Sequence, residues 1–552
     1  MKELGTRLKK AREYLGLTQE DVAKLMGVSR VIITNIEAGI RKVSAEELSK
    51  FSKIYGWTME ELLEGEKEEK MPMFARTFSE LSKEDQDEII NLIKKLVNKQ
   101  LDYSKYFSSP ELLANAVLEQ YKNEIGDIKY PINPFKILKS LDVKLVIKNF
   151  KKLEGLYIPA TSEEDIDVVA INFNRPLYRQ RFTAAHEICH CIKDKENLVI
   201  CPISGRKNNI ENFADKFAAC LLMPINELEK QVTKYIDENG YIELEKVIYV
   251  SEYFGVSFES CVFNIAYRLR RIDGNTDSNE LKKRIRKVSV DKLREQFGIK
   301  NNLKLTREIV DFYCYARPSE NNATNIKFKQ FLALNENRLE GVNINEEQIN
   351  YILADLRLNG NFSKYGSDSN PNILEALGNI ELLEYALNTN EKIDVWKLQK
   401  MQSLLYKYTP FGNQLPFPRQ EDNRINGAEI NTIDYRLIPQ ELIKVGEQIN
   451  TLIEKKELMT IHEYVLNAIK IHHRLTVIHP LNNGNGRCSR AMLLWLLRLK
   501  NIPPIYIQLE EKPKYIKALN MIDTKGDYDY LELLVLQEII HSMVIFDEKL
   551  EL

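Results

Sequence analysis

The chain has 552 residues, of which 44% are hydrophobic and 9% aromatic, and this composition excludes a disordered or fibrous protein. The length far exceeds one hydrophobic core, so we expect several domains, while a net charge of −2 selects no class of partner. No apolar run approaches the length of a membrane span, and the seven cysteines are odd in number and scattered. We therefore expect a cytoplasmic chain with reduced thiols and no membrane partner.

Residues 1–65 predict a small helical domain with a helix-turn-helix. Thr18-Gln19-Glu20-Asp21 has the pattern of a helix N-cap, and Gly27-Val28-Ser29 favours a tight turn. The helix from Ser29 to Glu37 is then the recognition helix, which would lie in the major groove of DNA. This segment resembles the XRE/Cro-like repressor domain, and the resemblance implies operator DNA as a partner.

The same resemblance implies which residues contact DNA. Gln19, Arg30 and Thr34 would face the bases, whereas Asn35 and Arg41 would meet phosphates. The segment carries eleven Lys and Arg against ten Asp and Glu, so attraction to phosphate is modest and binding needs a dimer or specific contacts. The alternative use is a protein-binding module. The expected core consists of Val22, Ala23, Leu25, Val28, Ile33, Ile36 and Leu48.

Residues 66–107 form a predicted connector. The run Gly65-Glu-Lys-Glu-Glu-Lys70 is typical of a charged hinge, and the apolar pattern from Glu80 to Val97 predicts an amphipathic helix. This helix is a candidate for homodimerisation.

Residues 108–270 contain a metal-binding pattern. His186 and His190 are one helical turn apart, so both imidazoles face the same way and can share a zinc ion. Glu187 lies beside them and is placed to act as a general base on a water at the metal. The alternative is a helix whose histidines pack without metal.

A second amphipathic helix follows from Glu211, and the helix pair resembles the ImmA/IrrE metallopeptidase family. The resemblance implies that Glu211 is the third zinc ligand, with Asp215 in a supporting role or as a substitute ligand. It implies either peptide hydrolysis, with a repressor or antitoxin protein as a partner, or metal binding alone. Cys189 and Cys191 read as apolar core residues, and redox tuning of the site is the less favoured alternative.

Residues 271–345 predict a basic, helical connector. The basic residues from Arg268 to Lys287 are typical of a solvated helix face, with nucleic-acid contact or a cleavable hinge as the alternatives. Residues 290–345 carry no recognised chemical pattern.

Residues 346–552 contain the densest cluster of chemical groups in the chain. From His479 to Arg490 the sequence is HPLNNGNGRCSR, in which Gly484, Asn485 and Gly486 favour a turn of converging backbone N–H groups. Arg487 and Arg490 can pair with phosphates, and the following helix adds its positive N-terminus. This pattern predicts a nucleotide site with His479 as the base.

The loop resembles the Fic signature H-P-F-x-[D/E]-G-N-G-R-x-x-R, and this resemblance implies transfer of AMP from ATP to a hydroxyl of a target protein. His479 would be catalytic, and Asn483, Gly484, Asn485, Gly486, Arg487 and Arg490 would bind the nucleotide. Two positions depart from the signature. Leu481 replaces Phe, and Asn483 replaces the acidic residue, so Mg²⁺ would bind more weakly to a neutral oxygen. The alternative is a site that binds nucleotide without reacting.

Two further features of Fic proteins are expected here. Residues 424–439 would form the hairpin that docks the target segment by strand addition. Fic enzymes are often restrained by a helix with [S/T]-x-x-x-E-[G/N], and the nearest match is taken at Leu356–Asn361, with Asn359 in place of the glutamate. An amide cannot form the ion pair, so this restraint would be weak.

Together these patterns predict a mainly α, multidomain fold. It comprises a helical head, an α+β zincin-like peptidase domain with a small sheet, and an all-α Fic domain with a hairpin flap. We expect a bacterial-type regulator and effector of toxin-antitoxin, stress or phage-related control, with zinc, Mg²⁺ and ATP. The alternative is a non-enzymatic transcriptional regulator that senses metal or nucleotide.

Overall fold

The computed structural model describes residues 2–64, 102–141, 143–160, 166–195, 199–203, 208–274, 276–299, 302–316, 322–360, 370–410, 416–423 and 432–547. The predicted hinge and connecting helix of residues 65–97 lie outside these ranges. The chain divides into two compact units, one of residues 1–70 and 319–552, the other of residues 71–318. No helix in the described ranges is long and apolar enough to cross a membrane.

The first unit begins with five helices, α1 (Lys2–Tyr14), α2 (Gln19–Met26), α3 (Arg30–Glu37), α4 (Ala45–Tyr55) and α5 (Met59–Glu64). Thr18 and Asp21 form a reciprocal capping box at the start of α2. Gly27 ends α2 with φ 69°, a left-handed conformation that glycine adopts at little cost, and this turn sets α3 against α2. The predicted core is present, with Leu25 and Val28 packed at its margin.

The core of these five helices continues into two helices that come more than 250 residues later in the sequence. These are α18 (Asn322–Leu339) and α19 (Glu346–Asn359), and Ile326 and Ala354 are buried in the same apolar cluster. Gly56 allows the close approach, because a Cβ there would lie 1.9 Å from Cδ1 of Ile326.

Two buried side chains fix this junction by donating to backbone carbonyls. Gln330 Nε2 donates to the Leu15 oxygen at 2.9 Å, and Arg357 Nε donates to the Ile54 oxygen at 2.9 Å. The helix-turn-helix is therefore packed into the first unit rather than merely tethered to it.

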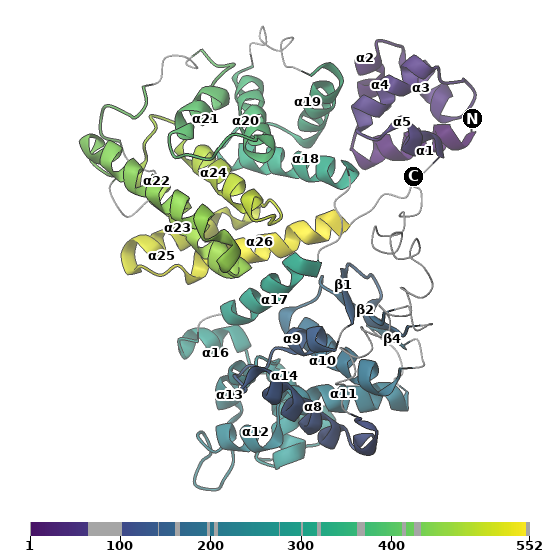
Figure 1. The fold of residues 1–552 in the computed structure, drawn as a ribbon, viewed down its shortest axis with the longest axis vertical. Coiled ribbons are helices and arrows are strands. Elements are labelled where there is room, and N and C mark those ends of the chain that lie inside the picture. Colours follow the sequence, from purple (N-terminus) through teal and green to yellow (C-terminus); the bar gives the residue numbers. More distant parts are fainter. Residues whose placement is uncertain are drawn as a thin grey trace, which may run out of the picture. The chain divides into compact units, whose positions relative to one another are not determined.

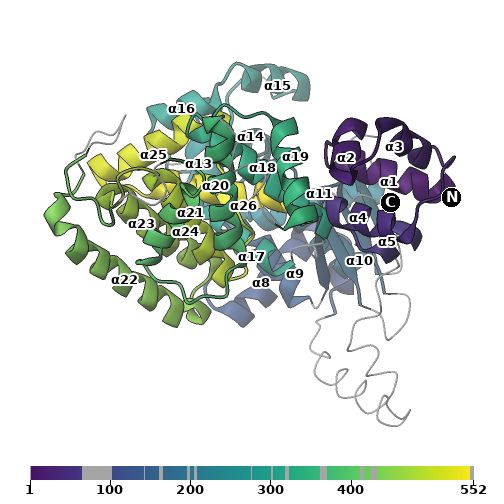
Figure 2. The same ribbon diagram turned by 90° about the horizontal axis from the view of Figure 1, so that it is seen from above.

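The rest of the first unit is a helical bundle. It contains α20 (Pro371–Asn388), α21 (Lys397–Leu405), α22 (Ile438–Glu454), α23 (Ile461–Ile478), α24 (Asn485–Leu499), α25 (Lys512–Lys525) and α26 (Asp529–Asp547), which are labelled in Figure 1 and Figure 2. Helix α24 is central, because it packs against both α20 and α23 and buries Trp495 completely. This packing fixes the loop that precedes α24.

The predicted hairpin is described only in part. Residues 424–431 lie outside the described ranges. Where a second strand was expected, Tyr435–Leu437 forms a single 3₁₀ turn that leads into α22, and Pro439 occupies the first turn of that helix.

The second unit combines helices with one four-stranded sheet of order β1-β3-β2-β4. The strands are β1 (Lys144–Lys148), β2 (Leu153–Ile158), β3 (Val168–Asn172) and β4 (Val199–Pro202); β1 is parallel to β3, and the other pairs are antiparallel. Helix α10 (Leu177–Lys193) packs on β2 and β3 and against α11 (Asn209–Leu222). The other α-helices described in the second unit are α8 (Pro110–Ile125), α9 (Pro134–Ser140), α12 (Ile225–Val232), α13 (Val247–Phe254), α14 (Phe258–Asn264), α15 (Ser278–Arg286), α16 (Val290–Gln296) and α17 (Leu303–Ala316).

Candidate functional site

His479 lies where α23 ends. The residue adopts φ 51° and its N–H closes the helix on Leu475, so the side chain leaves the helix axis at a sharp turn. Its Nδ1 lies 3.2 Å from the carbonyl oxygen of Thr476, which makes Nδ1 the protonated nitrogen and leaves Nε2 as a proton acceptor. Burial lowers the pKa of His479, so the imidazole is neutral at neutral pH.

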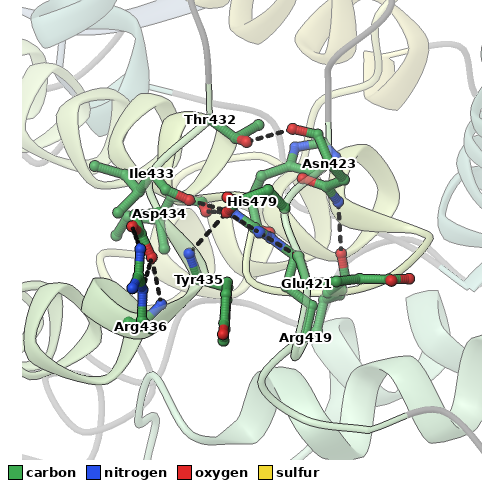
Figure 3. Close-up of polar contacts among 12 residues, drawn as sticks. Arg419, Glu421, Asn423, Thr432, Ile433, Asp434, Tyr435, Arg436 and His479 are labelled. Carbon is green, nitrogen blue, oxygen red and sulfur yellow. Dashed lines mark hydrogen bonds and ion pairs between the residues drawn. The ribbon is translucent and has the colours of Figure 1, made fainter.

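Arg419 forms hydrogen bonds with the backbone around His479 (Figure 3). Its guanidinium is fully buried, and Nε donates to the His479 oxygen at 2.8 Å. Its other nitrogens donate to the carbonyl oxygens of Glu421 and Ile433, and its backbone N–H donates to Pro480 at 2.9 Å. One side chain therefore joins three segments of backbone at the candidate base.

The loop after His479 is held by its own amides. Asn485 accepts from the Leu481 N–H at 2.9 Å and donates to the Leu481 oxygen at 2.7 Å, so its side chain fixes the loop shape. Gly484 has φ 81°, and a Cβ there would meet Leu405 at 2.6 Å. The Asn483 oxygen accepts from the Gly484 N–H at 2.8 Å. One lone pair of the Asn483 oxygen is thus used within the loop, and the neutral oxygen remains a weaker ligand for Mg²⁺ than a carboxylate would be.

Both arginines of the loop are buried and paired with carboxylates. Arg487 Nη1 lies 2.7 Å from Glu375, and its Nη2 donates to the Tyr406 hydroxyl at 3.2 Å. Arg490 contacts two acids from the end of α18, with Nε 2.8 Å from Glu336 and Nη2 2.7 Å from Glu340.

Glu336 and Glu340 differ in how burial and charge balance. Burial raises the pKa of Glu336 despite the attraction of Arg490. Burial also acts to raise the pKa of Glu340, but Arg490, Arg487 and Lys512 together lower it. A Cβ on Gly486 would lie 2.8 Å from an oxygen of Glu340, so this carboxylate lies against the glycine turn in space that a larger residue would fill. The arginines that could hold phosphates are therefore occupied by carboxylates of the same chain.

A second cluster lies between α10 and α11. Nε2 of His186 and Nε2 of His190 are 3.0 Å apart, while their Nδ1 atoms contact Asp215 at 3.0 Å and Asp194 at 2.8 Å. When each Nδ1–H donates to its carboxylate, two lone pairs face each other at hydrogen-bond distance, an arrangement that a cation between them stabilises. These contacts place Asp215 as the partner of His186.

Glu211 completes this cluster. Its carboxylate oxygens lie 3.3 Å from His186 Nε2 and 3.6 Å from His190 Nε2. Burial would lower the pKa of His186, but hydrogen bonds to Asp215 and Glu211 outweigh it and raise the pKa to about 9, which shows how strongly these acids favour positive charge. The two imidazoles and the carboxylate fit the ligand set of a zinc ion.

Glu187 faces the same cluster. Both of its carboxylate oxygens are buried without a hydrogen-bond partner, and burial raises its pKa. Space for the carboxylate comes from Gly155 on β2, where a Cβ would lie 2.3 Å from Glu187. A buried carboxylate with unused oxygens beside a cation site is suited to accept a proton.

Four of the residues expected to contact DNA lie on α2 and α3, and Arg41 lies in the loop after α3. Arg30 and Thr34 are exposed, and the Thr34 hydroxyl donates to Gln19 at 3.1 Å. Asn35 is half-buried, and exposed Arg41 pairs with Glu47 at 2.8 Å. None of these five side chains takes part in the junction with α18 and α19 described above.

Comparison with known proteins assigns three segments. Residues 8–62 match the helix-turn-helix model, residues 138–266 match the IrrE N-terminal-like domain, and residues 392–497 match the Fic/DOC family. The chain therefore joins three known domains. The order is the one that the sequence motifs predict.

Curated relatives of the Fic segment are named protein adenylyltransferase Fic. The match from Nematostella vectensis is 29% identical over 82 residues, or 15% of this chain and 19% of that protein. The match from Aedes aegypti is 30% identical over 95 residues, or 17% of this chain and 16% of that protein. The chain thus spans less than a fifth of these relatives. A solved Fic-domain signaling protein from Bacteroides thetaiotaomicron aligns with a TM-score of 0.36 and 18% identity, covering 44% of this chain and 96% of that one.

The restraint expected at Asn359 is not found there. Asn359 donates to Asp355 at 2.7 Å within α19, and the acid that meets Arg490 is Glu336. The sequence Glu336-Asn337 matches the E-[G/N] end of the restraining pattern. The match is incomplete because Leu332 occupies the position at which the pattern has Ser or Thr. Arg419 and Asp194 were also missed, because neither belongs to a motif and their roles come from contacts.

Proposed function

We propose that the Fic segment transfers AMP from ATP to a Ser, Thr or Tyr hydroxyl of a target protein. The observation that carries this proposal is His479 at the end of α23, whose Nδ1 faces the Thr476 oxygen so that Nε2 is left as a proton acceptor, in the same loop as the glycine turn and the two arginines. His479 accepts the hydroxyl proton while the oxygen attacks the α-phosphorus. The bond from that phosphorus to the β-phosphate oxygen breaks, and pyrophosphate leaves.

The other residues of the loop act by position and charge. Arg487 and Arg490 would neutralise the phosphates, together with the N–H groups at the start of α24. Asn485 keeps the loop in shape through Leu481, and Arg419 fixes the backbone of His479. Mg²⁺ held by phosphates and water would add charge neutralisation, and no step above depends on Asn483.

In this proposal the structure corresponds to a restrained state. Glu336 and Glu340 bind Arg490, so a nucleotide must displace them before its phosphates can use the same guanidinium. Separating a buried ion pair is costly unless a new anion replaces the lost one. The wild-type chain should therefore react slowly until Glu336 moves.

The test is label transfer in a bacterial lysate from ATP labelled on its α-phosphate, with purified Glu336→Ala and Glu336→Ala/His479→Ala, so that the proposed restraint is removed from both proteins. Label on protein that depends on His479 would support the proposal. Absence of label from ATP, GTP and UTP, with nucleotide still bound, would instead favour the alternative of a nucleotide-sensing regulator.

We further propose that the IrrE-like segment binds zinc through His186, His190 and Glu211 and cleaves peptide bonds. A zinc ion there would supply a Lewis acid that makes a bound water more acidic. Glu187 would take the proton of that water, while Asp215 and Asp194 keep the imidazoles in the right tautomer. Self-cleavage can be tested by mass spectrometry of the purified chain after incubation with zinc. The Glu187→Gln variant is the control. Fragments specific to the wild type would support cleavage, and identical intact masses would exclude self-cleavage.

We also propose that the helix-turn-helix binds operator DNA through Gln19, Arg30 and Thr34. Support comes from their position on α2 and α3, away from the junction with α18 and α19. The test is selection of bound sequences from random duplex DNA, followed by a gel shift with Arg30→Ala. Loss of a base preference in that variant is expected, and the lack of any selected sequence would favour a protein-binding module.

A further inference from the structure

Cys201 lies beside the proposed zinc ligands although it is far from the motif that identifies them. It sits on β4 opposite Gly155 of β2, the strand that makes room for Glu187. Its side chain is 5% exposed, and its Sγ lies 3.8 Å from an oxygen of Glu211. The short strand therefore places a thiol against the carboxylate of a candidate ligand.

The four side chains lie close enough together to share one metal ion. Ligand atoms of His186, His190, Cys201 and Glu211 all lie within 4.8 Å of one another, and no other such group occurs in the described part of the chain. Ligands about 2.0 to 2.3 Å from a tetrahedral zinc are about 3.3 to 3.8 Å apart. The two Nε2 atoms are 3.0 Å apart, oxygens of Glu211 lie 3.3 and 3.6 Å from them, and Cys201 Sγ lies 3.8 Å from Glu211. These separations are close to that range, and every separation in the group is at most 4.8 Å.

Other thiols near the site do not share this position. Cys189 and Cys191 flank His190 on α10 and are buried, yet neither belongs to the group of clustered ligand atoms. Proximity in sequence therefore does not bring a thiol to the site, whereas the pairing of β4 with β2 does. This contrast also provides a matched control.

We propose that Cys201 is a fourth protein ligand and that the resting zinc site is closed. This rests on the zinc site proposed above. Zinc sites with four protein ligands are typically structural, while catalytic sites keep one position for water. With the Cys201 thiolate bound, Glu187 has no water to deprotonate, so peptide hydrolysis requires that Cys201 leave the metal. In the resting site, Cys201 on β4 would occupy the position that a reactive water needs.

Cobalt provides a direct test, because a thiolate ligand gives Co²⁺ an intense sulfur-to-metal absorption that imidazole and carboxylate do not give. The full chain would be stripped of metal, loaded with Co²⁺ and compared with Cys201→Ser and Cys189→Ser, with circular dichroism to check folding. We expect the band in the wild type and Cys189→Ser and its loss in Cys201→Ser. A chelator competition should show zinc affinity lower by about tenfold or more in Cys201→Ser only.

The outcomes separate this inference from the zinc proposal. Weak visible bands of Co²⁺ without the sulfur band in the wild type, or the same sulfur band in Cys201→Ser, would overturn the role of Cys201 alone. Failure of the wild type to bind Co²⁺ or Zn²⁺ at all would overturn the zinc site itself.

Discussion

The Nε atom of Arg490 lies 2.8 Å from the carboxylate of Glu336, and both side chains are buried. The two residues are 154 positions apart, so the contact joins the end of α18 to the start of α24. A buried cation keeps its anionic partner until another anion replaces it. In the proposed function, this pair keeps Arg490 from the phosphates of a nucleotide until Glu336 moves.

The pH dependence of transfer should reflect a base with a lowered pKa. Burial shifts the pKa of His479 below 6.5, so the neutral, proton-accepting form persists above that lowered value. We expect a constant rate at neutral pH, falling as the pH falls through the pKa of the folded protein, below 6.5. The measurement is the initial rate of label transfer by Glu336→Ala against pH. A rate that falls already between pH 8 and 7 would contradict this role for His479.

Arg419→Ala should destabilise the loop that carries His479. The change leaves the carbonyl oxygens of His479, Glu421 and Ile433 without their donor in a buried setting, at a cost of about 3 kcal/mol or more. Label transfer should fall with the stability. Arg436→Ala is the matched control, because that guanidinium forms an exposed pair with Asp434 (Figure 3). Equal melting temperatures for both variants would refute the account.

Ile326→Asp should loosen the junction between the helix-turn-helix and α18. Burying a carboxylate in the shared apolar core costs about 3 kcal/mol or more, and Ile326 is only 9% exposed. We expect faster hydrogen exchange in α4 and α19 and unchanged exchange in α11. Val31→Asp, at a position 65% exposed on α3, serves as the control. Unaltered exchange in α4 would mean that the junction contributes little stability.

Removal of metal should destabilise the second unit. Without a cation, the two imidazole Nε2 atoms lie 3.0 Å apart and both oxygens of buried Glu187 lack a hydrogen-bond partner. Zinc that binds only the folded form at a hundredfold excess over Kd would add about 2.7 kcal/mol. We expect a chelator to lower the melting temperature of the wild type and to leave His190→Ala unchanged. Equal effects on both proteins would exclude a contribution from this site.

Much of both sites could be predicted because their signals are local. The spacing of His186 and His190 defines one helix face, and the run from His479 to Arg490 defines one loop. The contacts of Glu336, Cys201 and Arg419 could not be read this way, because each depends on a distant segment. Position 332 is an example, because it carries Leu where the restraining pattern has Ser or Thr, and yet Glu336 contacts Arg490.

The junction at Ile326 lay equally beyond sequence reasoning. Apolar residues on α18 predict burial but do not identify the surface that covers them. The charged residues that follow Gly65 indicated a separate head on a hinge. Only the structure shows that the lack of a side chain at Gly56 lets Ile326 pack into the core of helices α1 to α5.

The most direct test of the restrained transferase is label transfer from ATP labelled on its α-phosphate by the wild type, Glu336→Ala and Glu336→Ala/His479→Ala. The Asn359→Ala variant serves as a control from the helix where the restraint was first expected. We predict that Glu336→Ala raises transfer by about tenfold or more, equivalent to about 1.4 kcal/mol, that the double variant is silent and that Asn359→Ala matches the wild type. Equal transfer by Glu336→Ala and the wild type, with both proteins folded and binding ATP, would contradict the account.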